Sequence, residues 1–468
     1  MLRPASWTGT ALLATLLLGL VSACSAASLT DSPLVSSSVE TEPSLARLEL
    51  GKLHTQQHAF QLGTHYVHDR TAMGNRPPPP RTLRVGSLNI RYDYHSRHPV
   101  LSGVSSAVTS VLHHAKRPWG EHRWQERCDQ LVDQVLFHDL DVVGFQEVLH
   151  GQLGDLQEMM GEQEWAHVGV GRDDGREAGE AVPIFYRRSR LELVSVQHSW
   201  LSPTPTVPGS KGWDAGQPRM ITLARFRDLA LTEPHLSSPS SGTNACDLVV
   251  ANTHWDDRGL EAREESAKLI LRLVEEQVAA ANADAGSSSV PLVVLVGDLN
   301  SPPSEAGYQV LTGQRYPVED VKEPATGPVG PAASRAAFFD ARHELVKRRS
   351  GVQVSGGAMS RRFGPYNTYT GFEPSDVAKV IDFVLPLGNG AFVPASPSVT
   401  SSVPASSQTP APSAPEQQTR WRVTRYGVVQ NFFEDVGGRR GKDQDDDKDA
   451  MILSDHRLVV AAFEEAFV

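Results

Sequence analysis

Six short apolar segments of this chain end or begin at polar side chains of the kinds that catalyse reactions or bind ions. Apolar runs of this length, rich in β-branched residues, predict buried strands. A strand end is rigid, so it can hold a side chain in the narrow geometry that catalysis requires. One such residue is ordinarily a cap or a turn, whereas six strand ends in one chain favour a single polar centre. The residues are Asn89 after VGSL, Gln146 and Glu147 after VVGF, Asn252 and His254 after LVVA, Asp298 and Asn300 after VVLVG, Asp382 after KVI, and Asp455 and His456 before RLVVAAF.

Helical patterns alternate with these strands. Apolar residues at helical spacing predict helices over 120–137, 150–161 and 259–283. Further strands are expected at AVPIFYRR, ITLARF and DLVVANTHW, which are rich in β-branched and aromatic residues. An alternation of strands and helices along one chain predicts a layered α/β domain.

The N-terminus carries a targeting signal. Arg3 precedes the apolar run ALLATLLLGLV, and small residues follow it. This order predicts a secretory signal peptide over residues 1–26, and hence a secreted protein. The apolar run is shorter than the roughly 20 residues that a membrane-spanning helix needs. Two alternatives attach the protein to a membrane: a retained signal anchor, or a lipidated Cys24 in the VSAC box.

Two polar segments delimit the part of the chain that can form a core. Residues 27–80 are rich in polar residues and end in the stiff run RPPPPR, which predicts a disordered or linker segment. The Pro, Ser, Ala and Thr tract at 394–419 predicts a low-complexity insertion extruded from the surface. We therefore expect one catalytic domain over 81–468, interrupted by that insertion.

Charge and cysteine content exclude several classes of protein. The 44 Lys+Arg and 55 Asp+Glu residues give a net charge of −11, which is not the basic signature of a protein that coats nucleic acid. The three cysteines form no Cys-x-x-Cys motif, so a disulfide scaffold and a cysteine zinc site are excluded. Cys128 and Cys246 either pair in an oxidising compartment or lie apart as small buried residues.

The polar strand ends contain ligands for a hard cation. Glu147 is a carboxylate suited to Mg²⁺ or Mn²⁺, which favour oxygen ligands. Asn89 and Asp455 are candidates to complete such a site while leaving room for water and a substrate oxygen. A cation held there would neutralise a phosphoryl oxygen and orient the attack on phosphorus.

The remaining strand ends contain groups that move protons or donate hydrogen bonds. Asp298 in GDLN can orient and deprotonate a water molecule, and Asn300 can donate its amide to a phosphate oxygen. His254 and His456 can supply hydrogen bonds, or a proton, to the charge that develops during reaction.

The motifs SLN, QE, NTH, GDLN, ID and SDH occur in this order over 81–468 and resemble the endonuclease/exonuclease/phosphatase superfamily of metal-dependent phosphoesterases. The resemblance implies an α/β fold, a four-layer sandwich with two packed mixed β-sheets flanked by helices. It implies hydrolysis of a phosphodiester or phosphomonoester by in-line water attack. It also implies the site roles: Glu147 as the Mg²⁺ (or Mn²⁺) ligand assisted by Asn89 and Asp455, Asp298 as base, Asn300 on the phosphate, His254 and His456 on the transition state, and Asp382 orienting His456.

Four further residues are candidate substrate contacts, each with an ordinary alternative. By the same resemblance, Arg219 lies where a deoxyribonuclease-like enzyme has a phosphate-contacting arginine before a strand; the alternative is a surface ion pair. Glu180 is a candidate to orient His254, and Arg258 to line an anionic pocket. Tyr369 either flanks the substrate or packs in the core. Arg263, by contrast, is expected on the solvent face of its helix.

The expected partner is a phosphate-ester substrate: a nucleic acid, a lipid headgroup or a small phosphorylated molecule. No stable protein partner is inferred, and a monomer is expected. The competing hypothesis is a catalytically silent binding protein on the same scaffold. An intact set of titratable groups disfavours that hypothesis.

Overall fold

The computed structural model describes residues 81–93, 120–231, 247–284, 290–313, 337–345, 362–394, 419–434 and 450–467. These residues belong to one unit, Pro77–Val468. The predicted signal peptide at 1–26, the segment 27–80, nearly all of the insertion at 394–419, and Cys246 lie outside the described residues.

The first sheet has six strands in the order β10-β13-β1-β2-β4-β3. Its central pair, β1 and β2, is parallel, and its other neighbours are antiparallel. Both central strands are buried over most of their length and largely apolar, with buried polar residues only toward their ends, as expected for strands covered on both faces. The strands are β1 (Thr82–Asn89), β2 (Val142–Gln146), β3 (Trp165–Val168), β4 (Ile184–Arg187), β10 (Thr419–Val428) and β13 (Val459–Phe467).

The second sheet has five strands in the order β5-β6-β7-β8-β9. Here β7 and β8 are the parallel pair. A separate two-stranded hairpin is formed by β11 and β12. The strands are β5 (Leu191–Trp200), β6 (Met220–Asp228), β7 (Leu248–His254), β8 (Leu292–Asp298), β9 (Asp382–Pro386), β11 (Phe432–Glu434) and β12 (Ala450–Ile452).

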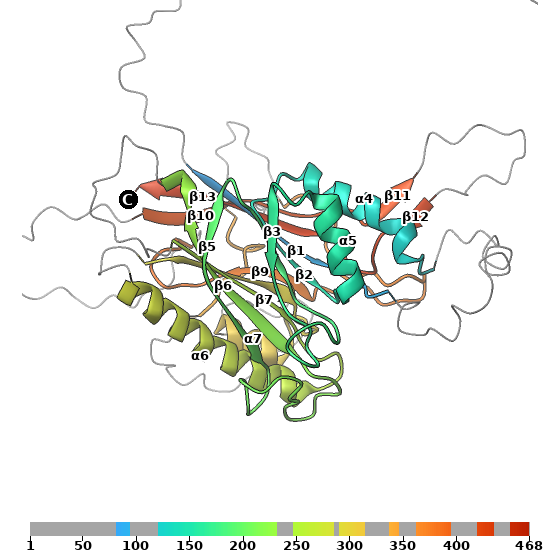
Figure 1. The fold of residues 1–468 in the computed structure, drawn as a ribbon, viewed down its shortest axis with the longest axis horizontal. Coiled ribbons are helices and arrows are strands. Elements are labelled where there is room, and N and C mark those ends of the chain that lie inside the picture. Colours follow the sequence, from blue (N-terminus) through green and yellow to red (C-terminus); the bar gives the residue numbers. More distant parts are fainter. Residues whose placement is uncertain are drawn as a thin grey trace, which may run out of the picture. The chain divides into compact units, whose positions relative to one another are not determined.

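Helices cover the outer face of each sheet (Figure 1). One apolar cluster joins the first sheet to α4 (Trp124–Phe137) and α5 (His150–Met160). Another joins the second sheet to α6 (Leu260–Asp284) and α7 (Ala306–Thr312). A third cluster draws side chains from both sheets and fills the space between them. The protein is therefore a four-layer α/β sandwich with two packed mixed sheets, which confirms the predicted fold class.

A layer of polar side chains joins the sheets just beneath one end of the sandwich. The Asn252 amide donates to the carbonyls of Phe145 and Pro183, each at 2.8 Å. Its oxygen accepts from Gln146 Nε2 at 2.8 Å. Gly144 permits this approach, since a Cβ there would lie 2.5 Å from Val296 and 2.7 Å from Asn252. Two polar strand-end residues of the sequence pattern thus bridge the sheets.

The predicted helices at 120–137, 150–161 and 259–283 are confirmed as α4, α5 and α6. The sequence analysis missed β3, β5, α7 and the short strands β11 and β12. The strand β5 is half exposed along most of its length, so its pattern lacks the continuous apolar run of the inner strands. Within the described residues, no helix is both long and apolar enough to cross a membrane.

Candidate active site at the ends of the two sheets

Strand register places three of the predicted residues side by side on the second sheet. His254 pairs with Asp298 across β7 and β8, and Asp298 pairs with Asp382 across β8 and β9. Residues paired across neighbouring strands point to the same face, so the three side chains form one row. Gly297 has a φ of 151°, and a Cβ there would lie 2.2 Å from the Thr253 carbonyl oxygen. Only glycine fits between the strands immediately before Asp298.

The first sheet brings the other half of the cluster to the same end of the sandwich. Asn89 ends β1 and pairs with Gln146, the last residue of the parallel strand β2. Glu147 follows with a left-handed backbone, φ 61°. Asp455 and His456 lie just before β13, which is antiparallel to β1. Because β1 and β13 run in opposite directions, the end of one lies beside the start of the other.

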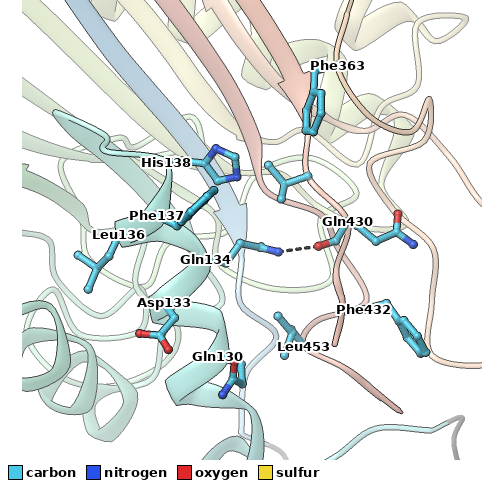
Figure 2. Close-up of a pocket in the computed structure, with 11 residues that line it drawn as sticks. Gln130, Asp133, Gln134, Leu136, Phe137, His138, Phe363, Gln430, Phe432 and Leu453 are labelled. Carbon is cyan, nitrogen blue, oxygen red and sulfur yellow. Dashed lines mark hydrogen bonds between the residues drawn. The ribbon is translucent and has the colours of Figure 1, made fainter. Parts of the chain in front are cut away.

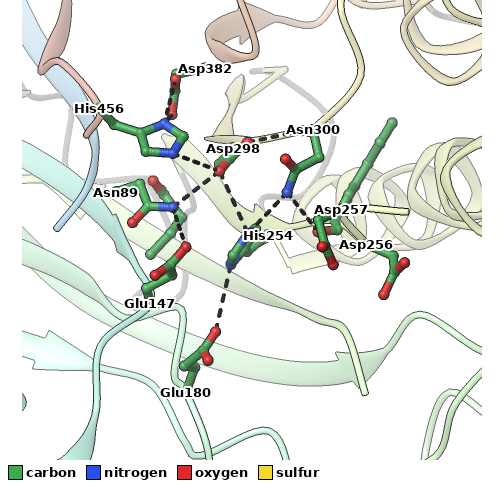
Figure 3. Close-up of polar contacts among 12 residues, drawn as sticks. Asn89, Glu147, Glu180, His254, Asp256, Asp257, Asp298, Asn300, Asp382 and His456 are labelled. Atoms are coloured by element: carbon green, nitrogen blue, oxygen red, sulfur yellow. Dashed lines mark hydrogen bonds and ion pairs between the residues drawn. The ribbon is translucent and has the colours of Figure 1, made fainter. Parts of the chain in front are cut away.

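Asp298 stands at the centre of the assembled cluster (Figure 3). Its Oδ2 accepts from Asn89 Nδ2 at 3.1 Å. The same oxygen lies 3.5 Å from His254 Nε2 and 3.5 Å from His456 Nε2. Its Oδ1 accepts the backbone N–H of Asn300 at 2.9 Å. Burial raises the pKa of Asp298 to about 7, with the negative charge of Asp382 adding to the shift and His456 opposing it.

His456 is held by a carboxylate on the side away from Asp298. Its Nδ1 lies 3.0 and 2.9 Å from the two carboxylate oxygens of Asp382, which is completely buried. Burial alone lowers the pKa of His456, but the charges of Asp382 and Asp298 outweigh it and raise the pKa well above its usual value. The ring is therefore an imidazolium at neutral pH, donating from both nitrogens.

His254 stands among guanidinium groups instead. Its Nδ1 lies 3.3 Å from the Arg219 guanidinium and 3.9 Å from the Glu180 carboxylate. Glu180 is itself held by Arg172 through two contacts of 2.7 and 3.1 Å. Burial, Arg219 and Arg172 together hold the pKa of His254 well below its usual value. This ring is neutral, and Asn300 Nδ2 lies 3.1 Å from its Nε2.

A second group of acidic side chains lies on the first-sheet side of Asp298. Asn89 Nδ2 donates to Glu147 Oε1 at 3.0 Å, and the backbone N–H of Tyr92 donates to Oε2 at 3.1 Å. Burial raises the pKa of Glu147, but Arg91 and the Asn89 amide outweigh it, and the pKa lies below its usual value. Burial raises the pKa of Asp455, and the charge of Glu147 adds to the shift.

This donor set fits a divalent cation. Glu147, Asp298 and Asp455 present oxygen donors, and the positive charges of His456 and Arg91 offset only part of their negative charge. Asn89 turns its nitrogen toward the carboxylates, while its oxygen accepts the N–H of Arg91 at 2.9 Å. Asp298, Asp382 and His456 also offer one ligand atom each within 4.8 Å of one another. Hard oxygen donors of this kind favour Mg²⁺ or Mn²⁺ over softer ions.

Comparison with known proteins agrees with this geometry. Residues 86–456 match the Endonuclease/Exonuclease/phosphatase family. The chain belongs to this family. A search of curated proteins found no match.

Solved structures of the family share the fold. A family protein from Bacteroides thetaiotaomicron is 23% identical, covers 82% of this chain and 95% of its own, and gives a TM-score of 0.52. A mannosyl-6-phosphatase from the same species is 23% identical over 82% of this chain and all of its own, with a TM-score of 0.51. A family protein from Bacteroides vulgatus is 23% identical, covers 82% of this chain and 100% of its own, and gives a TM-score of 0.50.

The structure brings most of the predicted site residues into one connected cluster. Tyr369 joins it through an edge contact with the His456 ring, whose centroid is 5.0 Å away. Arg258 does not join it: its side chain is 88% exposed and pairs with Asp257. The connected residues are Asn89, Glu147, Glu180, Arg219, His254, Asp298, Asn300, Asp382, Asp455, His456 and Tyr369.

One expectation about a nearby arginine is wrong. Arg263 is 5% exposed rather than on the solvent face of α6. Its guanidinium contacts Glu305 at 2.8 and 3.0 Å and donates to the Asp256 carbonyl at 2.9 Å. The loop that carries Glu305 covers this face of the helix, which helical periodicity alone does not reveal.

Sequence reasoning missed two arginines that border the cluster. Arg91 lies 3.9 Å from Glu147 and is fixed by Glu121 through contacts of 3.0 and 3.1 Å. Arg172 holds Glu180. Neither arginine ends an apolar strand pattern.

Two hollows lie apart from this cluster. One of about 800 Å³ lies between α4 and the turn after β10, bordered by Phe137, Phe363, Gln430 and Leu453 (Figure 2). Another of about 460 Å³ lies between α6 and the loop after β5. Neither is lined by any residue of the polar cluster. The polar cluster at the strand ends is therefore separate from both hollows.

Proposed function

We propose that this protein is a divalent-metal-dependent phosphoesterase that hydrolyses a phosphate ester by in-line attack of water. The observation that carries the proposal is the single buried carboxylate oxygen of Asp298, which faces His254, His456 and Asn89 at once. Membership of the family supports the same reaction class. The mannosyl-6-phosphatase with the same fold is a phosphatase by its name, and it suggests sugar phosphates as one substrate class to test.

Asp298 is the general base of the proposed reaction. Its raised pKa, about 7, makes it a stronger base than an ordinary aspartate while leaving much of it ionised at neutral pH. The Asn300 backbone N–H fixes Oδ1, and Oδ2, which also accepts from Asn89, is the oxygen that takes a proton from water. The Asn300 amide, beside His254, donates to a phosphoryl oxygen.

His456 is the cationic member of the pair that stabilises the transition state. Asp382 fixes its orientation and its charge, so its Nε2–H points toward the centre of the cluster. A fixed cation in a buried site stabilises developing negative charge without reorganisation. His254 contributes a neutral hydrogen-bonding ring, with Arg219 beside it as the phosphate-contacting arginine.

Glu147 and Asp455 are the residues that would hold the cation, assisted by Asn89, whose amide contacts Glu147. A bound Mg²⁺ or Mn²⁺ supplies charge neutralisation at the phosphoryl group. Tyr369 flanks the substrate, and its edge contact with His456 places its ring at the rim of the cluster.

We also propose that the protein acts outside the cytoplasm. This rests on the signal-like order of Arg3, the apolar run and the small residues at the N-terminus. Expression with and without residues 1–26 tests it. Export of the full-length protein alone, with cleavage near residue 26, is expected, and retention of both forms inside the cell contradicts it.

A substrate screen tests the proposed activity. The protein without residues 1–26 is incubated with Mg²⁺, Mn²⁺ or Ca²⁺ and with plasmid DNA, RNA, bis-p-nitrophenyl phosphate, sphingomyelin, inositol phosphates and mannose 6-phosphate. We expect turnover of at least one substrate that EDTA abolishes and added Mg²⁺ or Mn²⁺ restores.

Two variants control that screen. Glu147→Gln removes a carboxylate beside the predicted cation and should abolish both activity and the Mn²⁺-dependent rise in melting temperature. Glu192→Gln, on the exposed side of β5, should change neither. A wild-type protein that binds no divalent ion and turns over no substrate would instead support a catalytically silent binding protein.

A further inference from the structure

The segment 367–371 joins the two halves of the cluster. On one edge it pairs with the chain that leads into β9. The N–H groups of Thr368 and Tyr369 donate to the Lys379 carbonyl at 2.9 and 3.0 Å, and the Lys379 N–H donates back to the Tyr369 carbonyl at 3.1 Å. This edge belongs to the second sheet, whose strand β9 begins at Asp382.

On its other edge the same segment pairs with the chain that leads into β13. The Arg457 N–H donates to the Thr368 carbonyl at 2.7 Å, and the Thr370 N–H donates to the Asp455 carbonyl at 2.8 Å. Tyr369 and His456 form an antiparallel bridge. The segment thus hydrogen-bonds on one edge to the chain leading into β9 and on the other to the chain leading into β13, where Asp382 and His456 meet.

The Thr368 hydroxyl lies at the junction. Thr368 is completely buried, and its Oγ1 accepts two backbone N–H groups, from Ile381 and from Asp382, each at 3.0 Å. A buried N–H without a partner is costly, so these two bonds fix the backbone of Asp382. The Thr368 carbonyl meanwhile fixes Arg457, the neighbour of His456.

We propose that Thr368 is a positioning residue that sets the distance and angle between Asp382 and His456. The Thr368 hydroxyl contacts the backbone N–H groups of Ile381 and Asp382, not the Asp382 carboxylate. It acts by locking the start of β9 against the start of β13, so that the two carboxylate oxygens of Asp382 meet His456 Nδ1 at 3.0 and 2.9 Å. The inference rests on the proposed phosphoesterase reaction for its kinetic consequence but not for its structural one.

Thr368→Val tests the proposal, because valine keeps the shape of threonine and removes only the acceptor oxygen. We expect kcat to fall about 10–100-fold, as small displacements of catalytic groups do, with KM within about twofold. Thr368→Ser keeps the oxygen and should restore kcat to within about threefold of wild type. A Thr368→Val enzyme with wild-type kcat would overturn the proposal.

Thr312→Val is the matched control. Thr312 is also completely buried, and its hydroxyl donates to the Tyr308 carbonyl at 2.9 Å within α7. Loss of this hydroxyl should lower the melting temperature without changing kcat. An equal fall in kcat for Thr312→Val would show that loss of any buried hydroxyl has this effect, and would contradict a specific role of Thr368.

A double-mutant cycle with Asp382→Asn separates positioning from general stability. If Thr368 acts through Asp382, the Thr368→Val substitution should cost less than about twofold in kcat once Asp382 is Asn. The same fractional loss in both backgrounds would contradict the proposal, since the effect would then bypass Asp382.

A measurement that does not depend on turnover separates the role of Thr368 from the proposed phosphoesterase function. A histidine Nδ1 proton that is donated to a carboxylate resonates far downfield in the proton spectrum. We expect such a resonance, assigned to His456 by its loss in His456→Ala, in wild type and Thr368→Ser but not in Thr368→Val. If wild type hydrolyses none of the substrates, the proposed function fails, and this spectrum alone then supports or overturns the role of Thr368.

Discussion

The two histidines that face Asp298 have opposite electrostatic surroundings at equal distance from it. Each Nε2 lies 3.5 Å from the same carboxylate oxygen. Behind His456 stands Asp382, at 2.9 Å, and behind His254 stands the Arg219 guanidinium, at 3.3 Å. The first arrangement raises the pKa of its histidine and the second lowers it. One ring is therefore charged and the other neutral at the same pH.

The difference shows that two buried histidines can have opposite pKa shifts when their neighbours differ. Burial disfavours the charged form of both rings, so the neighbour behind each ring decides its state. The carboxylate of Glu180 would ordinarily stabilise a protonated His254. It forms two contacts with Arg172 instead. The His254 side of Asp298 thus offers neutral hydrogen bonds, while the His456 side offers a cation.

Asp298→Asn should have the largest effect on kcat, because both His254 and His456 face this carboxylate. Loss of the general base should lower kcat by about 10³–10⁴-fold in assays at saturating Mg²⁺. Activity within tenfold of wild type would contradict the assignment of Asp298 as base.

The same substitution should stabilise the metal-free fold. The pKa of Asp298 is raised from 3.8 to about 7, so its ionised form is disfavoured in the folded state. This cost is complete above pH 7 and absent below pH 3.8. In EDTA, Asn should raise the free energy of unfolding by about 2–4 kcal/mol at pH 8 and by little at pH 4. Equal melting temperatures at pH 8 would show that burial of Asp298 is not costly.

Replacing each histidine in turn should have different effects on kcat and on the pH profile. His456→Ala should lower kcat by about 10³-fold and move the acid limb of the pH profile above pH 7, since the cation that opposes protonation of Asp298 is gone. His254→Ala should lower kcat by about 10²-fold and leave that limb in place. Acid limbs that shift equally in both variants would remove the distinction between the two rings.

Asp382→Asn should make His456 resemble an ordinary histidine. Asp382 raises the pKa of His456 by its charge and its hydrogen bond, so its loss should move the alkaline limb to lower pH. We expect about 10–100-fold lower kcat at pH 7, and a greater loss at pH 9. An unchanged alkaline limb would mean that His456 does not set it.

The residues at the centre of the cluster could be predicted from the sequence, because each of them adjoins a recognisable strand pattern. Asn89, Asp298 and His456 each adjoin an apolar strand, and any folding of those strands into one sandwich gathers their ends. The motif order then gave the fold class. Polar strand ends alone did not separate site from scaffold, since Asn252 follows the same pattern and bridges the sheets instead.

The surroundings that distinguish the two histidines could not be predicted in this way. Arg172 acts through a hairpin turn that brings it back onto Glu180. Thr368 acts through a segment that pairs with the chain leading into β9 and with the chain leading into β13, which is distant in sequence. No local periodicity reports such contacts, because they depend on which loops lie beside which strand ends.

Arg172→Met should have the smallest effect on activity. It tests whether the Arg172–Glu180 ion pair keeps His254 neutral. Removing the guanidinium frees Glu180, whose Oε2 already lies 3.9 Å from His254 Nδ1, to stabilise a charged ring. The pKa of His254 should therefore rise from well below its usual value toward it, although Arg219 still opposes protonation. With two cationic rings beside Asp298, we expect about tenfold lower activity at pH 6 and less change at pH 8.

The double variant Arg172→Met/Glu180→Gln decides how that loss arises. It lacks both charges, so His254 should return to neutrality, and activity at pH 6 should recover although the Arg172 contacts are still missing. Titration of the His254 ring followed by NMR provides the direct measurement. If the double variant is as impaired as Arg172→Met, the arginine acts by holding its loop against Gln217 and not by controlling the charge on Glu180. The neutrality of His254 would then follow from burial and Arg219 alone.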